Sequence, residues 1–183
     1  MKSLNLPIVS LLGVALWAAQ ASPPASPGMV DFHKLVANYM KIRQTAASGV
    51  ANLKTTDSPE KIRGHQSDLA AAIRSARSGA AQGDIFTGAI TAEFRRIIRT
   101  SLSGPGAEHV RKSLKDTQPS PLPPITVNGA YPIDQPVPSM PPSLLQALPE
   151  LPRGLEFRFV GRTLILRDGE ANLIVDFMNE ALP

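Results

Sequence analysis

The stretch from Leu155 to Phe177 constrains the fold most, because apolar and polar residues alternate along it. Gly161-Arg162 separates two such runs, and a two-residue loop with glycine first is typical of a type II′ hairpin turn. The predicted register pairs Phe159 with Leu164, Phe157 with Leu166 and Glu156 with Arg167. One face of this hairpin is apolar and the other faces water. A small ribbon of this kind is unstable alone, so its apolar face needs helices to pack on.

A third strand is expected after the hairpin. The residues from Asp168 to Asn172 favour turns, and Asn172 suits the left-handed position of a bulged loop. The segment from Leu173 to Phe177 then returns along the hairpin. The alternative is a C-terminal helix, because Leu173, Ile174, Phe177, Met178, Ala181 and Leu182 also fit one helical stripe.

The N-terminus has the pattern of a secretory signal peptide over residues 1–21. Lys2 precedes an apolar stretch, and Ala19-Gln20-Ala21 has the small residues of a cleavage site. An uncleaved membrane anchor is the alternative, although Pro7 and the short apolar span argue against it. We therefore expect a periplasmic or secreted protein that starts at Ser22, with a linker over 22–29 and no stable membrane insertion after cleavage.

Three helices are expected between residues 30 and 118. The first is predicted over Asp31 to Lys54, with Asp31 as its cap and Val30 and Leu35 as a hydrophobic staple. The second begins at Ser58-Pro59-Glu60 and forms an antiparallel hairpin with the first. The third begins at Asp84, and a short, weaker helix follows over Ala107 to Lys115.

Eleven prolines mark the segment 119–153, which we call the strap. Prolines favour extended paths without a regular hydrogen-bond ladder. Apolar residues are spaced through the strap, and a disordered linker seldom carries so many. We predict that much of the strap lies extended across the helices, with one helical turn from Ser143 to Leu148. The alternative is that its proline runs serve as ligands for a partner protein.

The sequence does not bring together a catalytic or metal-binding set. Ser58 with Lys61 matches the S-x-x-K form of penicillin-recognising enzymes, but the accompanying motifs are missing, and a helix cap accounts for Ser58. His65, Ser67 and Asp68 lie too close together on one helix to face each other. The three histidines, His33, His65 and His109, lack metal-ligand spacing. No catalytic residue, metal site or cofactor is therefore predicted.

A basic patch is the one candidate binding surface. Its members are the arginines of the second and third helices: Arg74, Arg77, Arg95, Arg96 and Arg99. On an exported protein such a patch suits anionic lipid, polysaccharide or an acidic protein. Nucleic acid is not expected, because no aromatic residues are interleaved with the arginines and the net charge is only +4. A solvated helix face is the alternative.

Two resemblances follow from longer stretches. The segments Gly83–Arg99, Tyr131–Pro152 and Gly154–Phe177 resemble a family of exported bacterial proteins with no assigned function. Gly154–Phe177 also resembles the C-terminal strand repeat of periplasmic nickel/cobalt-homeostasis proteins, through Val160-Gly161, Leu166, Asp168 and Ile174-Val175-Asp176. That resemblance implies a small antiparallel unit. The chain lacks the His-rich tract that metal homeostasis would need.

These observations predict an α+β fold. A three-helix layer (30–118) precedes the strap (119–153), and an antiparallel segment over 154–183 packs on the helices as part of the same unit. We expect a soluble, exported, non-enzymatic protein that binds an unidentified protein or envelope partner. Two alternatives stay open. One is a small hydrolase whose site uses His109 or His33 across the strap, and the other is a periplasmic metal or stress accessory protein.

Overall fold

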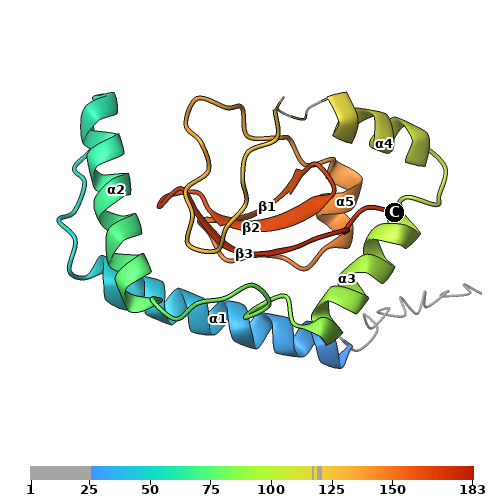
Figure 1. Cartoon of the computed structure of the whole chain (residues 1–183), viewed down its shortest axis with the longest axis horizontal. Helices are drawn as coiled ribbons and strands as arrows, with labels where there is room; N and C mark the ends of the chain where they lie inside the picture. Colours follow the sequence, from blue (N-terminus) through green and yellow to red (C-terminus); the bar gives the residue numbers. More distant parts are fainter. Residues whose placement is uncertain (1–25, 117, 119–120) are drawn as a thin grey trace, which may run out of the picture.

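The structure is a computed structural model that describes residues 26–116, 118 and 121–183. The predicted signal peptide and linker residues 22–25 lie outside the described residues. The α+β prediction is confirmed, because helices precede a three-stranded antiparallel sheet (Figure 1). The elements are α1 (Pro27–Ala47), α2 (Pro59–Ala76), α3 (Gly88–Ser101), α4 (Ala107–Asp116), α5 (Pro142–Ala147), β1 (Leu155–Val160), β2 (Thr163–Asp168) and β3 (Leu173–Met178). None of the described helices is both long and apolar enough to cross a bilayer.

The β1–β2 hairpin has the predicted register. Phe157 pairs with Leu166, Phe159 with Leu164 and Glu156 with Arg167, and the last pair forms the expected ion pair across the strands. Gly161 has φ +58°, and Arg162 is not among the residues with positive φ, which is the pattern of a type II′ turn. The turn residues therefore fix which side chains face the helices.

The third strand is confirmed, and the C-terminal helix alternative is wrong. β3 pairs with β2, and Asn172 has φ +47° at the end of the loop that joins them. A register shift lies at Leu166/Arg167, which face Asp176 and Ile174 and leave Val175 as the extra residue. The bulge is thus within the strand rather than in the loop.

Two helices begin at positions other than those predicted. α1 starts at Pro27 after the N-cap Ser26, so Asp31 is not its cap, and Val30 is 56% exposed rather than part of a staple. Proline suits the first position of a helix, where its missing N–H is not needed. α3 starts after Thr87, whose hydroxyl accepts from the Ile90 N–H. The predicted cap Asp84 instead accepts from the Ala81 N–H in the preceding loop.

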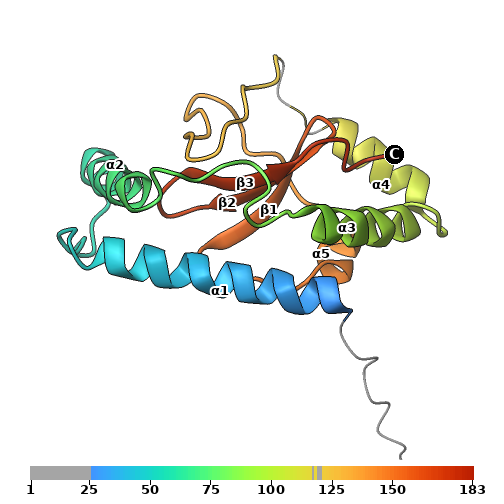
Figure 2. The same ribbon diagram turned by 60° about the horizontal axis from the view of Figure 1, so that its bottom comes forward.

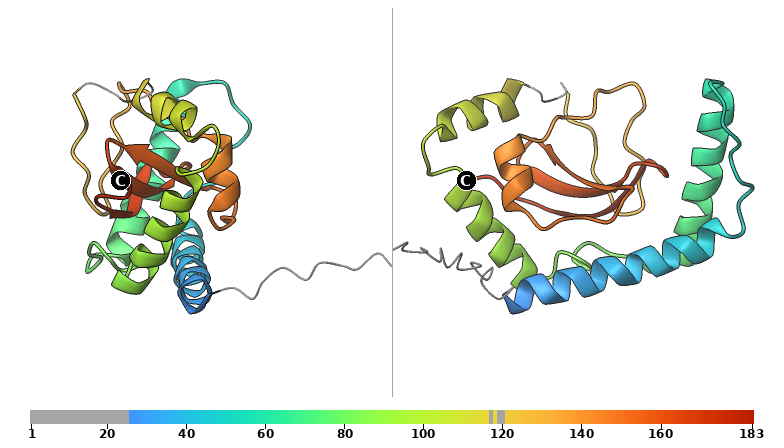
Figure 3. Two further views of the ribbon diagram at one scale, coloured as in Figure 1. Left: turned by 90° about the vertical axis from the view of Figure 1, so that its right-hand side faces the viewer. Right: turned by 180° about the vertical axis from the view of Figure 1, so that it is seen from behind.

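The N-terminal helices pack on the sheet at steep angles to one another (Figure 1). Figures 1 and 3 show α1 along the sheet, α2 at one end of α1 and α3 at the other. The predicted antiparallel hairpin of α1 and α2 is wrong. The connection after Ala47 first runs along α2 before the chain turns into it, so α2 crosses α1 steeply. The start of α2 is as predicted, because the Ser58 hydroxyl accepts from the Lys61 N–H.

One face of the sheet packs on the helices around a cluster of phenylalanines. The ring centroids of Phe94 and Phe157 lie 5.7 Å apart, and those of Phe32 and Phe94 lie 5.0 Å apart. Phe157 and Phe159 are 1% and 0% exposed. The sheet and the helices are therefore one folded unit, as the apolar hairpin face required.

The other face of the sheet does not face water as predicted, because the strap covers it. Tyr131 of the strap packs against Val160, Ile165 and Ile174 in a second, smaller core. The strap also bonds to the edge of β3, since the Asn128 N–H donates to the Ile174 carbonyl at 2.8 Å. Figure 2 shows this part of the strap on the side of the sheet opposite α1.

The later part of the strap buries apolar side chains against the helices, as predicted for much of the strap, while the earlier part touches α2 through the hydrogen bonds of Asn128 with Arg74 and Arg77. Leu144 and Leu148 belong to the main core, and α5 contacts α3. α5 itself lies within a residue of the predicted helical turn. The two halves of the strap thus cover opposite faces of the sheet.

Candidate functional site

The five arginines of the predicted patch do not form one free basic surface. Arg77 is buried, and its guanidinium donates to the Asn128 side chain at 2.8 Å and to the Val175 carbonyl at 3.1 Å. Arg74 donates to the Asn128 carbonyl. These two residues tie α2 to the strap and to β3, so their role is structural.

The three arginines of α3 lie elsewhere. Arg95 donates to the carbonyls of Asn179 and Glu180, and Arg96 pairs with Glu93 at 2.6 Å. Arg99 is exposed near the end of the helix. Since two of these three charges are engaged within the chain, the predicted patch is reduced to a single exposed arginine and one surface ion pair.

The buried acids also serve the fold. Asp168 is fully buried and accepts from the Tyr39 hydroxyl at 2.9 Å, from Arg43 Nε at 2.6 Å and from the Ala171 N–H at 3.0 Å. Arg43 also pairs with the exposed Glu170. A buried carboxylate needs such partners to be stable, and this set fixes α1 to the loop between β2 and β3.

The second buried acid, Asp176, holds the loop that precedes α3. Its carboxylate accepts from the N–H groups of Gly83, Ile85 and Phe86 at 3.0, 2.8 and 2.7 Å. Gly83 has φ +92°, a conformation that favours glycine. The loop thus directs three backbone donors at one carboxylate, and this carboxylate fixes the conformation of the loop.

The ionisation of this interior follows from its burial. Burial raises the pKa of the Tyr39 hydroxyl well above its ordinary value, and the neighbouring Asp168 adds to the effect. Burial lowers the pKa of Arg77 below its ordinary value, although Tyr39, Asp84 and Asp176 oppose that shift. A neutral Tyr39 hydroxyl is therefore available to donate to Asp168 over the whole neutral range.

The three histidines lie on separate helices, α1, α2 and α4. The Nδ1 atom of His65 lies 3.1 Å from the Ala51 carbonyl, and His33 packs against the ring of Phe32. Within residues 26–116, 118 and 121–183, no three His, Asp or Glu side chains are placed to hold a metal ion. The histidines are thus not assembled with the buried acids, which already have other partners.

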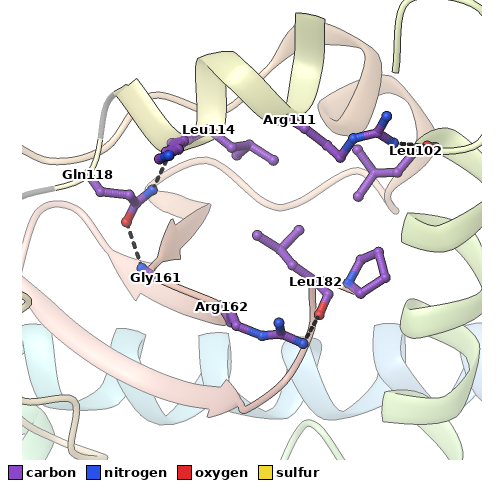
Figure 4. A pocket seen from close by; sticks show the side chains of 9 residues that line it. Leu102, Arg111, Leu114, Gln118, Gly161, Arg162 and Leu182 are labelled. Carbon is purple, nitrogen blue, oxygen red and sulfur yellow. Dashed lines mark hydrogen bonds between the residues drawn. The ribbon is translucent and has the colours of Figure 1, made fainter. Parts of the chain in front are cut away.

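A largely apolar cavity of about 310 Å³ lies at the turn end of the sheet. We call it the turn cavity. Figure 4 shows α4 as one wall and the hairpin turn with the C-terminal tail as the other. Its lining comprises Leu102, Arg111, Leu114, Lys115, Gln118, Gly161, Arg162, Leu182 and Pro183. Ligand sites in proteins are typically concave and mainly apolar with a few polar groups, and this volume is at their lower limit.

Local bonds hold the two walls of the turn cavity in place. Gln118 accepts from the Gly161 N–H at 2.6 Å and donates to the Leu114 carbonyl at 2.8 Å. The tail is held against the turn, because the Ala181 N–H donates to the Arg162 carbonyl at 2.8 Å. The Gln118 amide thus bridges α4 and the hairpin, and the C-terminal tail forms the wall of the cavity beside the turn.

Three cations surround this apolar space. Arg162 is neutralised by Glu180 at 2.8 Å. Arg111 donates one N–H to the Leu102 carbonyl, which leaves other donors of its guanidinium for a ligand. In the part of the chain that the structure describes, the Lys115 ammonium has no ion-pair partner. Arg111 and Lys115 are four residues apart on α4 and so share a face.

Sequence reasoning missed these residues. The available signal was the recurrence of Arg111, Leu114 and Lys115 at helical spacing on α4, with Gln118 just after the helix. The opposite wall comes from the hairpin turn and the tail, more than forty residues further along the chain, and no local pattern predicts that approach.

The comparisons with known proteins do not assign a role to the cavity. No protein-family model matches this chain, and neither a curated protein nor a solved structure is similar enough to be a match. The resemblances to exported bacterial proteins and to periplasmic nickel/cobalt-homeostasis proteins therefore stay predictions.

Proposed function

We propose that the protein is exported and acts as a soluble, non-catalytic binding protein whose ligand site is the turn cavity. The observation that carries this proposal is an apolar hollow of about 310 Å³ that three separate segments line with leucine side chains. The signal-peptide pattern of residues 1–21 supports export. The buried carboxylates support a binding role rather than catalysis, because both are engaged by hydrogen-bond partners within the fold.

The turn cavity is favoured over the larger hollow beside β1 and α5. That hollow is lined by Glu156 and Arg158, which pair with each other at 2.6 Å. Glu156 also pairs with Arg167, so its carboxylate is already engaged by two arginines. A ligand in that hollow would have to compete with these ion pairs, whereas the leucines of the turn cavity lose only water.

The test is binding of a neutral apolar probe, N-phenyl-1-naphthylamine, to the protein purified from expressing bacteria. We expect its fluorescence to rise on binding, and Leu182→Trp to abolish the rise because the indole fills the cavity. Leu145→Trp is the matched control, since Leu145 is 54% exposed and lies in the hollow beside α5. Probe binding that survives Leu182→Trp but is lost in Leu145→Trp would place the site elsewhere and contradict the proposal.

A further inference from the structure

We infer that the turn cavity takes a single-chain carboxylate, a fatty acid of roughly eight to ten carbons, with its chain among the leucines and its headgroup at Arg111 and Lys115. This inference rests on the proposed function and names the ligand class of the same site. A cavity of about 310 Å³ has the volume of about ten water molecules, and a methylene group needs about the same room as a water molecule. The volume therefore suits one short acyl chain.

The placement of charge selects the headgroup. Arg111 and Lys115 project from one face of α4, beside the apolar side chain of Leu114. Their aliphatic stems extend the apolar lining, while their charged ends stay in water at its rim. Arg111 keeps donors beyond its bond to the Leu102 carbonyl, and Lys115 has no ion-pair partner among the described residues, so each can attract a carboxylate. A neutral or cationic amphiphile lacks that complement.

Arg162 contributes to the wall rather than to the headgroup site. Its Nη2 atom donates to the Leu182 carbonyl at 2.9 Å and pairs with Glu180. Glu180 has φ +50°, a backbone conformation that residues other than glycine rarely adopt. The arginine thus holds the tail in the position that closes the cavity, and the selection between headgroups falls to α4.

The experiment is calorimetric titration of the protein with decanoate, octanoate and decanol below their aggregation concentrations. We expect decanoate to bind about three- to tenfold more tightly than decanol, because two exposed charge contacts add modestly to the apolar binding. Octanoate should bind about fifteenfold more weakly than decanoate, since it buries two fewer methylene groups.

Charge variants test the headgroup. The double variant Arg111→Gln, Lys115→Gln should lose the preference for decanoate over decanol. Lys112→Gln is the control, because it removes one of the positive charges of the same helix at an exposed position outside the cavity lining, where the double variant removes two. Circular dichroism and Tm confirm that each variant is folded.

The outcomes separate the two claims. Equal binding of decanol and decanoate by the unaltered protein would overturn the carboxylate inference and leave the apolar ligand site standing. Binding of neither compound would overturn both. A loss of the preference in Lys112→Gln equal to that in the double variant would show a general effect of net charge, and this result also contradicts a headgroup site at Arg111 and Lys115.

Discussion

The two ends of the sheet use charged side chains in opposite ways. At the end where β2 and β3 are joined, Asp168 is buried with Tyr39 and Arg43 as partners. At the hairpin-turn end, Lys115 and Arg111 stand at the rim of an apolar cavity. The loop end is therefore closed by internal bonds, while the turn end keeps apolar surface and positive charge available. The buried charges at the loop end thus stabilise the fold, whereas the exposed charges beside the apolar turn cavity belong to the candidate site.

The largest expected change in the free energy of unfolding comes from removing the bonds of Asp168 at the loop end. Asp168→Ala removes an acceptor from the buried Tyr39 hydroxyl and from Arg43, and we expect unfolding to become easier by about 3–5 kcal/mol. Urea denaturation measures this change. Glu170→Ala is the control, because Glu170 also pairs with Arg43 but its side chain is 60% exposed, and its loss should cost under about 1 kcal/mol. Equal effects of the two substitutions would contradict the account of the loop end.

The strap gives the next largest effect. Tyr131 is buried against the second face of the sheet, and its hydroxyl donates to the Pro136 carbonyl at 2.9 Å. Tyr131→Ala should destabilise the protein by about 3 kcal/mol through the lost apolar burial. Ile133→Ala, two residues on and 78% exposed, should change stability by less than about 0.5 kcal/mol. A strap that is loosely attached would make both substitutions neutral.

A smaller change in folding stability is expected at high pH. The pKa of Tyr39 is raised by its burial and by Asp168, so the hydroxyl ionises more readily in the unfolded chain than in the folded one. The stability that this difference contributes is fully present below the ordinary tyrosine pKa of about 10 and falls above it, by about 1.4 kcal/mol per pH unit. Thermal melts between pH 9 and 12 should show this slope. Tyr39→Phe should make the slope shallower, and an unchanged slope would refute the link.

The hairpin could be predicted from sequence because its determinants are local. Alternation fixes which faces of β1 and β2 are apolar, and Gly161 fixes the register. The third strand followed from the turn residues before Leu173. In each of these cases the residues that decide the structure are neighbours in the chain.

The parts that could not be predicted depend on distant partners. The strap packs on the second face of the sheet because Val160, Ile165 and Ile174 make that face apolar too. The sequence predicted that this face is exposed to water, because Glu156, Arg158 and Arg167 also lie on it. The arginines at 74 and 77 looked like a surface patch until α2 packed them against Asn128. The turn cavity exists only because the tail returns beside α4.

The most direct test of the difference between the two ends is a chemical-shift map of the ¹⁵N-labelled protein titrated with decanoate. We expect the amides of Leu114, Gly161 and Leu182 to shift and to saturate together, and those of Ala171 and Asn172 at the loop end to stay in place. Shifts centred on the loop end, or on the hollow beside β1, would contradict the claim that the turn cavity is the ligand site.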